Sequence, residues 1–286
     1  MKKLIYRLPV LLLGIVFAFA SCDYVDQPYM EGGNGNNVKD TVRKILIEDF
    51  TGHACINCPD AHDAGRIIID LYGDQVVFVA IHAGYFSQPD NPPFDYDFRT
   101  PMGNDLYNHF GVSVVPIGMI NRTPKNGSST PLIGYTGWAS EASRYLDSLS
   151  EEPDAYIHLD VSFDAADSTI DISTETTFFS PNATSRKYNL VLVVTESKII
   201  KAQKHGSITI PDYEHNHVLR GGVTSTWGDE IHDGIVSTGD VKTKDYSNFK
   251  LGSDWNPDNC HVVAYLYYND GADQYKIIQA QEVSVK

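Results

Sequence analysis

Residues 44–59 read KILIEDFTGHACINCP, and this segment decides the first half of the fold. Its apolar start, residues 45–50, predicts a strand, and a short turn then leads to Cys55 and Cys58. Two cysteines at this spacing, directly after a strand, are typical of sites that exchange thiols and disulfides. One thiolate attacks a substrate disulfide, and the second sulfur, one helical turn away, resolves the mixed disulfide.

The residues that follow predict a helix and a second strand. Pro59 suits the first turn of a helix, where its missing N–H costs no hydrogen bond. Apolar residues recur at helical spacing as far as Leu71, and Gly73 ends the helix. Residues 76–82 are almost continuously apolar, as in a strand buried on both faces. Residues 44–82 therefore predict a β-α-β unit with the cysteine pair at its first strand–helix turn.

Further elements are expected after this unit. Residues 102–109 and 137–149 predict helices. Pro116 cannot donate a backbone hydrogen bond, so we place it at the start of a strand that continues from Ile117. Residues 85–98 form an insertion rich in aromatic and acidic residues. It either lines a binding surface or packs its rings over a seam between domains.

The character of the sequence changes after Pro153. Runs that alternate in polarity or are rich in β-forming residues replace the helical pattern. They lie at residues 156–163, 168–174, 188–195, 261–268 and 277–285. Several short strands joined by polar turns predict an antiparallel β-sandwich.

The N-terminus predicts export and a lipid anchor. A basic stretch at residues 2–7 precedes an apolar run at 11–20, which is too short to span a bilayer. Residues 1–21 therefore read as a secretory signal. The segment from Phe19 to Cys22 looks like a bacterial lipobox, in which Cys22 is diacylated and becomes the mature N-terminus. The alternative is an ordinary signal peptide that is cleaved near the same place.

The composition limits the kinds of partner that the protein is expected to bind. The net charge of -15 argues against nucleic acid and against electrostatic binding to anionic lipid, so the membrane would be reached through the lipid on Cys22. Residues 22–42 are polar and predict a flexible tether. Three of the four cysteines then remain, a close pair and Cys260, which is expected to be a small buried core residue. This odd count does not fit a framework of structural disulfides, although export places the chain in an oxidising compartment.

Two resemblances follow from these residues. Residues 44–150 resemble the thioredoxin fold, in which Asp49 matches a buried acid beneath the cysteines and Pro116 a cis-proline that faces them. More closely, the chain is similar to the Omp28-related outer membrane lipoproteins. The similar segments are residues 50–59, 215–220 and 279–281. This resemblance implies an outer-membrane lipoprotein, lipid-anchored in the cell envelope and facing either the periplasm or the surface.

Together the motifs assign roles to the site residues. A helix N-terminus stabilises a thiolate, so Cys55 is expected to be the exposed nucleophile and Cys58 the buried resolving thiol. His53, if protonated near Cys55, would favour the thiolate further. Asp49 would accept the proton of Cys58, since burial raises the pKa of a carboxyl group. Pro116 would present backbone groups to an extended substrate.

Other interpretations remain open. The cysteine pair is alternatively a static disulfide on a non-enzymatic binding lipoprotein. A zinc site would need two more ligands, for which His62 and His82 are the candidates. His215 and His217 alternate on an expected strand and would share one face. Two such imidazoles can bind a metal ion, but a hydrogen-bonded structural pair is the favoured interpretation.

The sequence thus predicts an α/β plus all-β protein. A thioredoxin-like domain at residues 43–152 is followed by an antiparallel, immunoglobulin-like β-sandwich domain at 153–286. The expected activity is thiol–disulfide exchange on envelope proteins, whose thiols or disulfides would be the clients. No dissociable cofactor, metal or nucleic acid is expected to take part.

Overall fold

The computed structural model describes residues 41–125, 127–147 and 153–286. The expected signal at residues 1–21, Cys22 and nearly all of the tether at 22–42 lie outside these described residues. Thr41–Lys286 forms one compact unit. Within the described ranges, no helix has the length and apolar character needed to cross a membrane.

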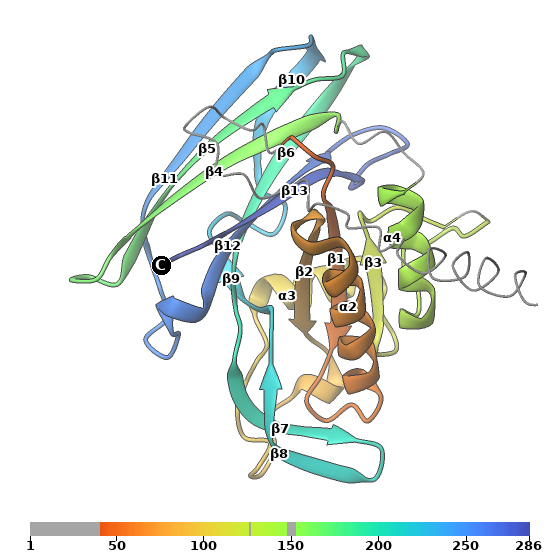
Figure 1. Cartoon of the computed structure of the whole chain (residues 1–286), viewed down its shortest axis with the longest axis vertical. Coiled ribbons are helices and arrows are strands. Elements are labelled where there is room, and N and C mark those ends of the chain that lie inside the picture. The colour runs from red at the N-terminus through yellow and green to blue at the C-terminus, as the bar shows by residue number, and fades with distance from the viewer. Residues whose placement is uncertain (1–40, 126, 148–152) are drawn as a thin grey trace, which may run out of the picture. The chain divides into compact units, whose positions relative to one another are not determined.

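The unit is mostly β-structure, arranged in several sheets (Figure 1). The largest sheet has eight strands in the order β13-β12-β6-β9-β2-β1-β3, with β10 paired to β6. These strands are β1 (Ile45–Thr51), β2 (Val76–His82), β3 (Ile117–Ile120), β6 (Asn182–Glu196), β9 (Val218–Gly222), β10 (Asp229–Val236), β12 (Cys260–Tyr268) and β13 (Ile277–Ser284).

Two smaller sheets and a few helices complete the unit. The sheet β11-β5-β4 is formed by β4 (Ala155–Asp164), β5 (Thr169–Phe178) and β11 (Val241–Lys250). A separate hairpin pairs β7 (Ile199–His205) with β8 (Ile208–His215). The α-helices are α2 (Cys58–Tyr72), α3 (Pro101–His109) and α4 (Trp138–Leu146). Short 3-10 turns lie at Gly73–Gln75, Tyr85–Ser87, Tyr135–Gly137 and Pro257–Asn259.

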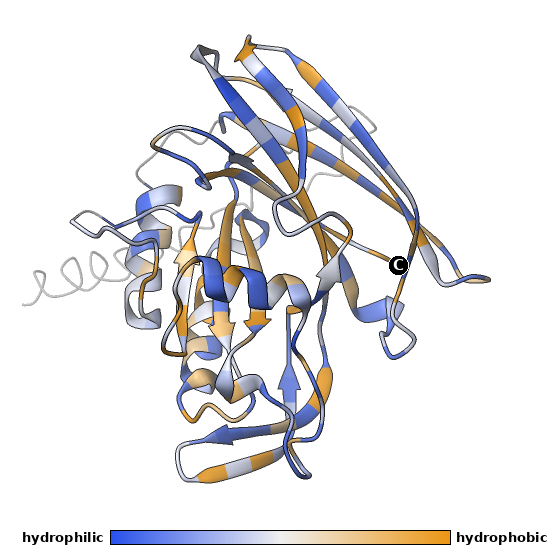
Figure 2. Cartoon of the chain, turned by 180° about the vertical axis from the view of Figure 1, so that it is seen from behind, coloured by the Kyte–Doolittle hydropathy of each residue, from blue (hydrophilic) through white to orange (hydrophobic). Residues whose placement is uncertain are grey.

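The β-α-β unit expected at residues 44–82 is confirmed. β1 and β2 run parallel, with Ile45 opposite Val76, and every residue of both strands is buried. Burial on both faces explains why both strands are mostly apolar, with Glu48 and Asp49 of β1 as buried exceptions. Figure 2 shows the contrast with the rest of the molecule, because the central strands are mostly apolar whereas the long outer strands alternate. β3 lies antiparallel to β1 on its other side.

The large sheet crosses the domain boundary expected at residues 152/153. β9 lies between β2 and β6, pairing in parallel with β2 through Ala80 and Val218 and antiparallel with β6. The buried guanidinium of Arg122 also joins the two segments, with Nε 2.8 Å from Glu48 Oε2 and Nη2 2.9 Å from Tyr265 Oη. One sheet and the buried hydrogen bond from Arg122 to Tyr265 thus connect the segments on either side of that boundary.

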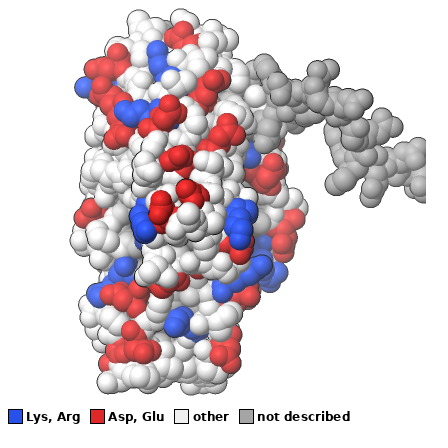
Figure 3. Space-filling model, turned by 90° about the vertical axis from the view of Figure 1, so that its left-hand side faces the viewer, with Lys and Arg blue, Asp and Glu red and all other residues white. Residues whose placement is uncertain are grey.

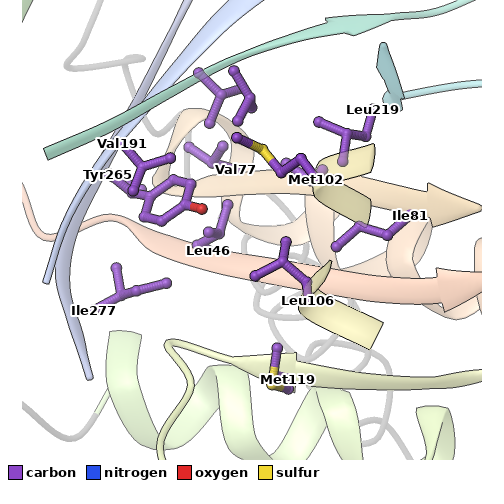
Figure 4. Packing of buried hydrophobic residues seen from close by; sticks show 14 of the residues in the cluster. Leu46, Val77, Ile81, Met102, Leu106, Met119, Val191, Leu219, Tyr265 and Ile277 are labelled. Atoms are coloured by element: carbon purple, nitrogen blue, oxygen red, sulfur yellow. The ribbon is translucent and has the colours of Figure 1, made fainter. Parts of the chain in front are cut away.

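The alternation along β6 shows why the segments share a core. Val191 and Val193 pack in one apolar cluster, whereas Leu190, Leu192 and Val194 pack in another. Successive side chains of a strand point to opposite faces, so β6 is covered on both. The first cluster lies between the large sheet and α3, and combines residues from both segments. Those labelled in Figure 4 are Leu46, Val77, Ile81, Met102, Leu106, Met119, Val191, Leu219, Tyr265 and Ile277.

The second cluster joins the large sheet to the β11-β5-β4 sheet. Ile157 and Ile172 of the smaller sheet pack with Leu190 and Leu192 of β6. The strands expected after residue 153 are therefore confirmed, and two sheets do pack face to face. The outward faces are polar, and Figure 3 shows acidic and basic side chains interspersed across one side. Such exposed ion pairs contribute little to stability.

Candidate functional site

The cysteines lie at the turn that leads from β1 into α2. Cys55 and Cys58 form a disulfide with Cα atoms 5.5 Å apart, and α2 begins at Cys58 with Pro59 in its first turn. This separation is ordinary for a disulfide. The third cysteine of the described residues, Cys260, is a buried free thiol, and burial raises its pKa to about 12. Cys260 is therefore inert, as expected of a core residue.

Pro116 lies beside the disulfide. The Val115–Pro116 peptide is cis, and the carbonyl oxygen of Val115 lies 3.7 Å from Cys55 Sγ. Ile117 then begins β3 opposite Phe50 of β1. The structure thus brings together Pro116 and Cys55, two residues that the sequence assigned to one site.

Asp49 is fully buried on β1 beneath the cysteine turn. Burial raises the pKa of its carboxyl group, and His62 opposes part of this shift. The Nε2 of His62 lies 3.4 Å from Asp49 Oδ2. Sequence reasoning considered His62 only as a metal ligand. Its spacing from Cys58 was the available signal, because residues four apart share one face of a helix.

His53 does not provide the positive charge that the sequence suggested. Its side chain is buried against Phe94 and Phe98, and its Nε2 lies 3.1 Å from the carbonyl oxygen of Gln88. Burial lowers the pKa of His53, so the imidazole is neutral at pH 7. The aromatic insertion therefore packs its rings over the cysteine turn.

A close approach of the same insertion requires Gly52. The backbone N–H of Ala54 donates to the carbonyl oxygen of Phe86 at 3.0 Å, and Ser87 Oγ donates to that of Thr51 at 2.7 Å. A Cβ on Gly52 would lie 2.5 Å from the Phe86 oxygen. Only glycine permits this contact, which fixes the entrance to the cysteine turn.

The β7–β8 hairpin covers the turn, as Figure 1 shows at the lower end of α2. The backbone N–H groups of Lys204 and Gly206 donate to the carbonyl oxygens of His53 and Ile56, both at 2.9 Å. Gln203 Nε2 donates to the carbonyl oxygen of Cys55 at 2.9 Å. No pattern in the sequence indicated this contact.

Both sulfur-bearing residues are consequently buried. Cys55 is 3% exposed and Cys58 0% exposed. The expectation that Cys55 is exposed is therefore wrong, because the hairpin and the Val115 carbonyl lie over it.

His215 and His217 do not share a face. β8 ends at His215, and His217 has a positive φ of 55° that turns the chain before β9 begins. His215 packs against His82 and Phe98, with its ring centroid 4.6 Å from that of Phe98. Burial lowers the pKa of His215 to about 3 and that of His217 to about 4, so both rings are neutral at pH 7.

An open cavity of about 390 Å³ lies behind the site, between α2 and the end of β8. Its lining combines charged, aromatic and apolar side chains: His62, Asp63, Arg66, Ile69, Phe78, Tyr213, Glu214, Asn216 and His217. Over the described part of the chain, no three His, Cys, Asp or Glu side chains are grouped to hold a metal ion. His62 faces Asp49 and Tyr213, whereas His82 stacks on Phe98.

A family model described as "Outer membrane protein Omp28" matches residues 103–286. The chain belongs to the Omp28 family. The family's description as outer membrane proteins indicates a protein of the cell envelope. The matched range includes Pro116 and the β7–β8 hairpin of this Omp28-family chain and begins after the cysteine pair. No curated protein matches the chain.

Two solved structures resemble this Omp28-family chain. HBP35 of Porphyromonas gingivalis has a TM-score of 0.65 and 16% identity, and the match covers 85% of this chain and 76% of that one. A structural-genomics protein from Agrobacterium tumefaciens has a TM-score of 0.52 and 13% identity, with 86% of this chain and 96% of that one covered. At these identities the likeness concerns the fold.

Proposed function

We propose that this Omp28-family protein is a lipid-anchored outer-membrane lipoprotein whose thioredoxin-like Cys55–Cys58 site exchanges disulfides with envelope proteins. The observation that carries the proposal is the disulfide at the start of α2 with the Val115 carbonyl oxygen 3.7 Å from Cys55 Sγ. A sulfur at a helix N-terminus lies in the positive end of the helix dipole, which stabilises the thiolate.

The steps of the proposed exchange follow from the positions of Cys55 and Cys58. In the reduced protein, the Cys55 thiolate attacks a client disulfide and forms a mixed disulfide, releasing one client thiolate. Cys58 then loses its proton to Asp49, and its thiolate attacks the Cys55 sulfur. The Cys55–Cys58 bond re-forms and the second client thiolate leaves. The protein dithiol is thereby oxidised and the client disulfide reduced, and the reverse sequence oxidises a client.

One observation supports a second function. Both sulfurs are buried beneath the hairpin, which is the environment of a structural disulfide. In that case the protein is a non-enzymatic binding lipoprotein and Cys55–Cys58 only stiffens the turn. The hairpin must move before a protein client reaches Cys55, whereas the binding function requires no such motion.

The reduction potential of the Cys55–Cys58 pair separates the two functions. A value between about −120 and −270 mV marks an exchanging pair, whereas one below about −300 mV marks a structural one. A Cys58→Ser protein tests the same point in cells, because Cys55 can attack but cannot be released. We expect it to accumulate mixed disulfides with clients, and Cys55→Ser/Cys58→Ser is the control. If the single variant traps nothing in its native envelope, the binding function replaces the exchange function.

Lipid attachment has its own test. A Cys22→Ala protein should be released from the membrane fraction, because the expected acyl chains are the proposed hold on the bilayer. Ser21→Ala is the matched control, since it leaves the lipidated residue in place. A Cys22→Ala protein that still pellets firmly with membranes would exclude the lipid anchor.

A further inference from the structure

His62 connects the buried acid beneath the cysteine turn to the cavity. It lies on α2 four residues after Cys58, so the two side chains emerge from one face of the helix. Its Nε2 lies 3.4 Å from Asp49 Oδ2 and 3.0 Å from Thr51 Oγ1. Its Nδ1 lies 2.8 Å from the hydroxyl of Tyr213, which belongs to the hairpin.

Solvent exposure increases from Asp49 to His62. The side chain of Asp49 is 0% exposed, whereas that of His62 is 18% exposed and lines the cavity of about 390 Å³. Among the described residues, no donor makes a hydrogen bond to either carboxylate oxygen of Asp49. His62 thus both lies against the buried carboxyl group and lines the cavity.

We propose that His62 carries the proton between Asp49 and water in the cavity during the resolving step, an inference that rests on the proposed thiol–disulfide exchange. Cys58 gives its proton to Asp49 as its thiolate forms the bond to Cys55 and the client thiolate leaves. Asp49 passes that proton to His62 Nε2, and the imidazolium then gives up a proton to cavity water. The reverse direction returns a proton to Cys58 by the same path.

The contact with Tyr213 accommodates the tautomer that this transfer needs, because a phenol hydroxyl both donates and accepts hydrogen bonds. A neutral ring that donates its Nδ1–H to the Tyr213 hydroxyl leaves Nε2 as the acceptor that faces Asp49. The hydroxyl comes from β8, so the hairpin that covers the sulfurs also orients the imidazole. His62 acts through Asp49 and does not contact the client.

The surroundings of His62 carry both signs of charge. Titratable and charged groups face it or lie along the cavity from β1, from α2, from β8 and from the turn that follows β8: Asp49, Asp63, Arg66, Tyr213, Glu214 and His217. His82 and His215 lie close enough that His62 contributes to lowering the pKa of each. Burial keeps His82, His215 and His217 neutral at pH 7, so they do not compete for the proton.

A single turnover tests the inference with a small probe. Reduced protein is mixed with glutathione disulfide and quenched with acid, and mass spectrometry follows closure of the Cys55 mixed disulfide from about pH 5.5 to 8.5, the range in which histidine titrates. General acid–base catalysis contributes about 10²–10⁴-fold. Because His62→Gln retains Asp49, we expect closure to slow about tenfold and the pH profile to lose one ionisation.

Chemical rescue separates proton transfer from a structural role. His62→Ala extends the existing cavity, so added imidazole should restore closure in proportion to its neutral form. His158→Gln is the matched control, because His158 is exposed on β4 and pairs with Asp160 of the same strand. That variant should close at the wild-type rate. Tyr213→Phe keeps the imidazole and should slow closure about threefold, within the worth of one hydrogen bond.

Each result has one meaning. Closure of His62→Gln at the wild-type rate with the wild-type pH profile would overturn the inference while the exchange function survives. Slow closure that imidazole does not restore would reduce His62 to a structural residue. A wild-type protein that forms no mixed disulfide would remove the exchange function and the inference together. Titration of the Asp49 carboxyl by NMR adds a readout without turnover, because removing His62 should raise its pKa further.

Discussion

The β1-α2-β2 unit and the β7–β8 hairpin meet at the cysteine pair, yet different forces hold them. β1 and β2 are buried along their whole length, whereas the hairpin exposes Ile200 (49%) and Ile208 (60%). The hairpin meets the cysteine turn through a few hydrogen bonds. Segments with few buried apolar contacts open at lower free energy than a core. The two cysteines thus belong to the well-buried β1-α2-β2 unit, whereas the hairpin that covers them is expected to open at lower free energy.

The largest expected difference is in stability. Phe50→Ala removes a fully buried ring from β1 and should lower the free energy of unfolding by about 3–5 kcal/mol. Ile208→Ala on the hairpin removes an exposed side chain and should change it by about 0.5 kcal/mol or less. Urea unfolding of both variants measures the contrast. Equal losses would show that the hairpin is as firmly held as the core.

The next effect depends on pH and on the contact between His215 of the hairpin and His82 of β2. Burial lowers the pKa of His215 to about 3, so the unfolded chain binds a proton at this residue that the folded chain does not. Its contribution to stability is complete above the ordinary value of about 6.5 and is lost as pH falls from there towards about 3. At pH 5 the expected loss is about 2 kcal/mol.

His215→Phe sharpens this measurement. The new ring can pack on Phe98 without titrating, so the variant should lose about 2 kcal/mol less than the wild type between about pH 7.5 and 5. His158→Gln is the control, because His158 is exposed on β4. Identical pH slopes for His215→Phe and the wild type would show that the His215 site stays hydrated.

The smallest expected effect concerns the cover itself. Gln203→Ala removes the hydrogen bonds from Nε2 to the carbonyl oxygens of Gly52 and Cys55 and should cost about 1 kcal/mol. Because this loosens the hairpin, dithiothreitol should reduce the disulfide about fivefold faster. Thr209→Ala on the exposed strand of the same hairpin is the control. An unchanged reduction rate would mean that the hairpin does not limit access to the sulfurs.

Local sequence patterns were sufficient to predict the strands and the helix that form the cysteine turn. The strand at Ile45–Thr51, the helix that begins at Cys58 and the strand at Val76–His82 follow from apolar runs, a cysteine spacing and a proline. Pro116 was placed at its strand by its missing N–H, and the structure adds that Val115 lies against Cys55. These are properties of neighbours in the chain, which a sequence displays directly.

Pairing between distant segments was not predictable in this way. β9 is short, covering only Val218–Gly222. It joins β2 to β6 because its backbone pairs with β2 on one edge and with β6 on the other. The apolar run in β6 indicated a strand and was assigned to a separate sandwich, but the structure buries it on both faces, against each of two clusters. The hairpin lacks a distinctive apolar pattern. It contacts the cysteine turn partly through backbone hydrogen bonds, which any residue type can make.

The sequence by itself determined the chemistry that is available: two cysteines at a helix start, a carboxyl group on the preceding strand and a proline further along the chain. Only the tertiary structure decided the solvent exposure, the charge and the neighbours of these groups. It buried both sulfurs under Gln203, made His53 neutral and placed His62 between Asp49 and an open cavity. The reason is physical, since a pKa and the reach of a sulfur depend on desolvation and on groups within a few ångströms, and folding brings those groups from distant parts of the chain.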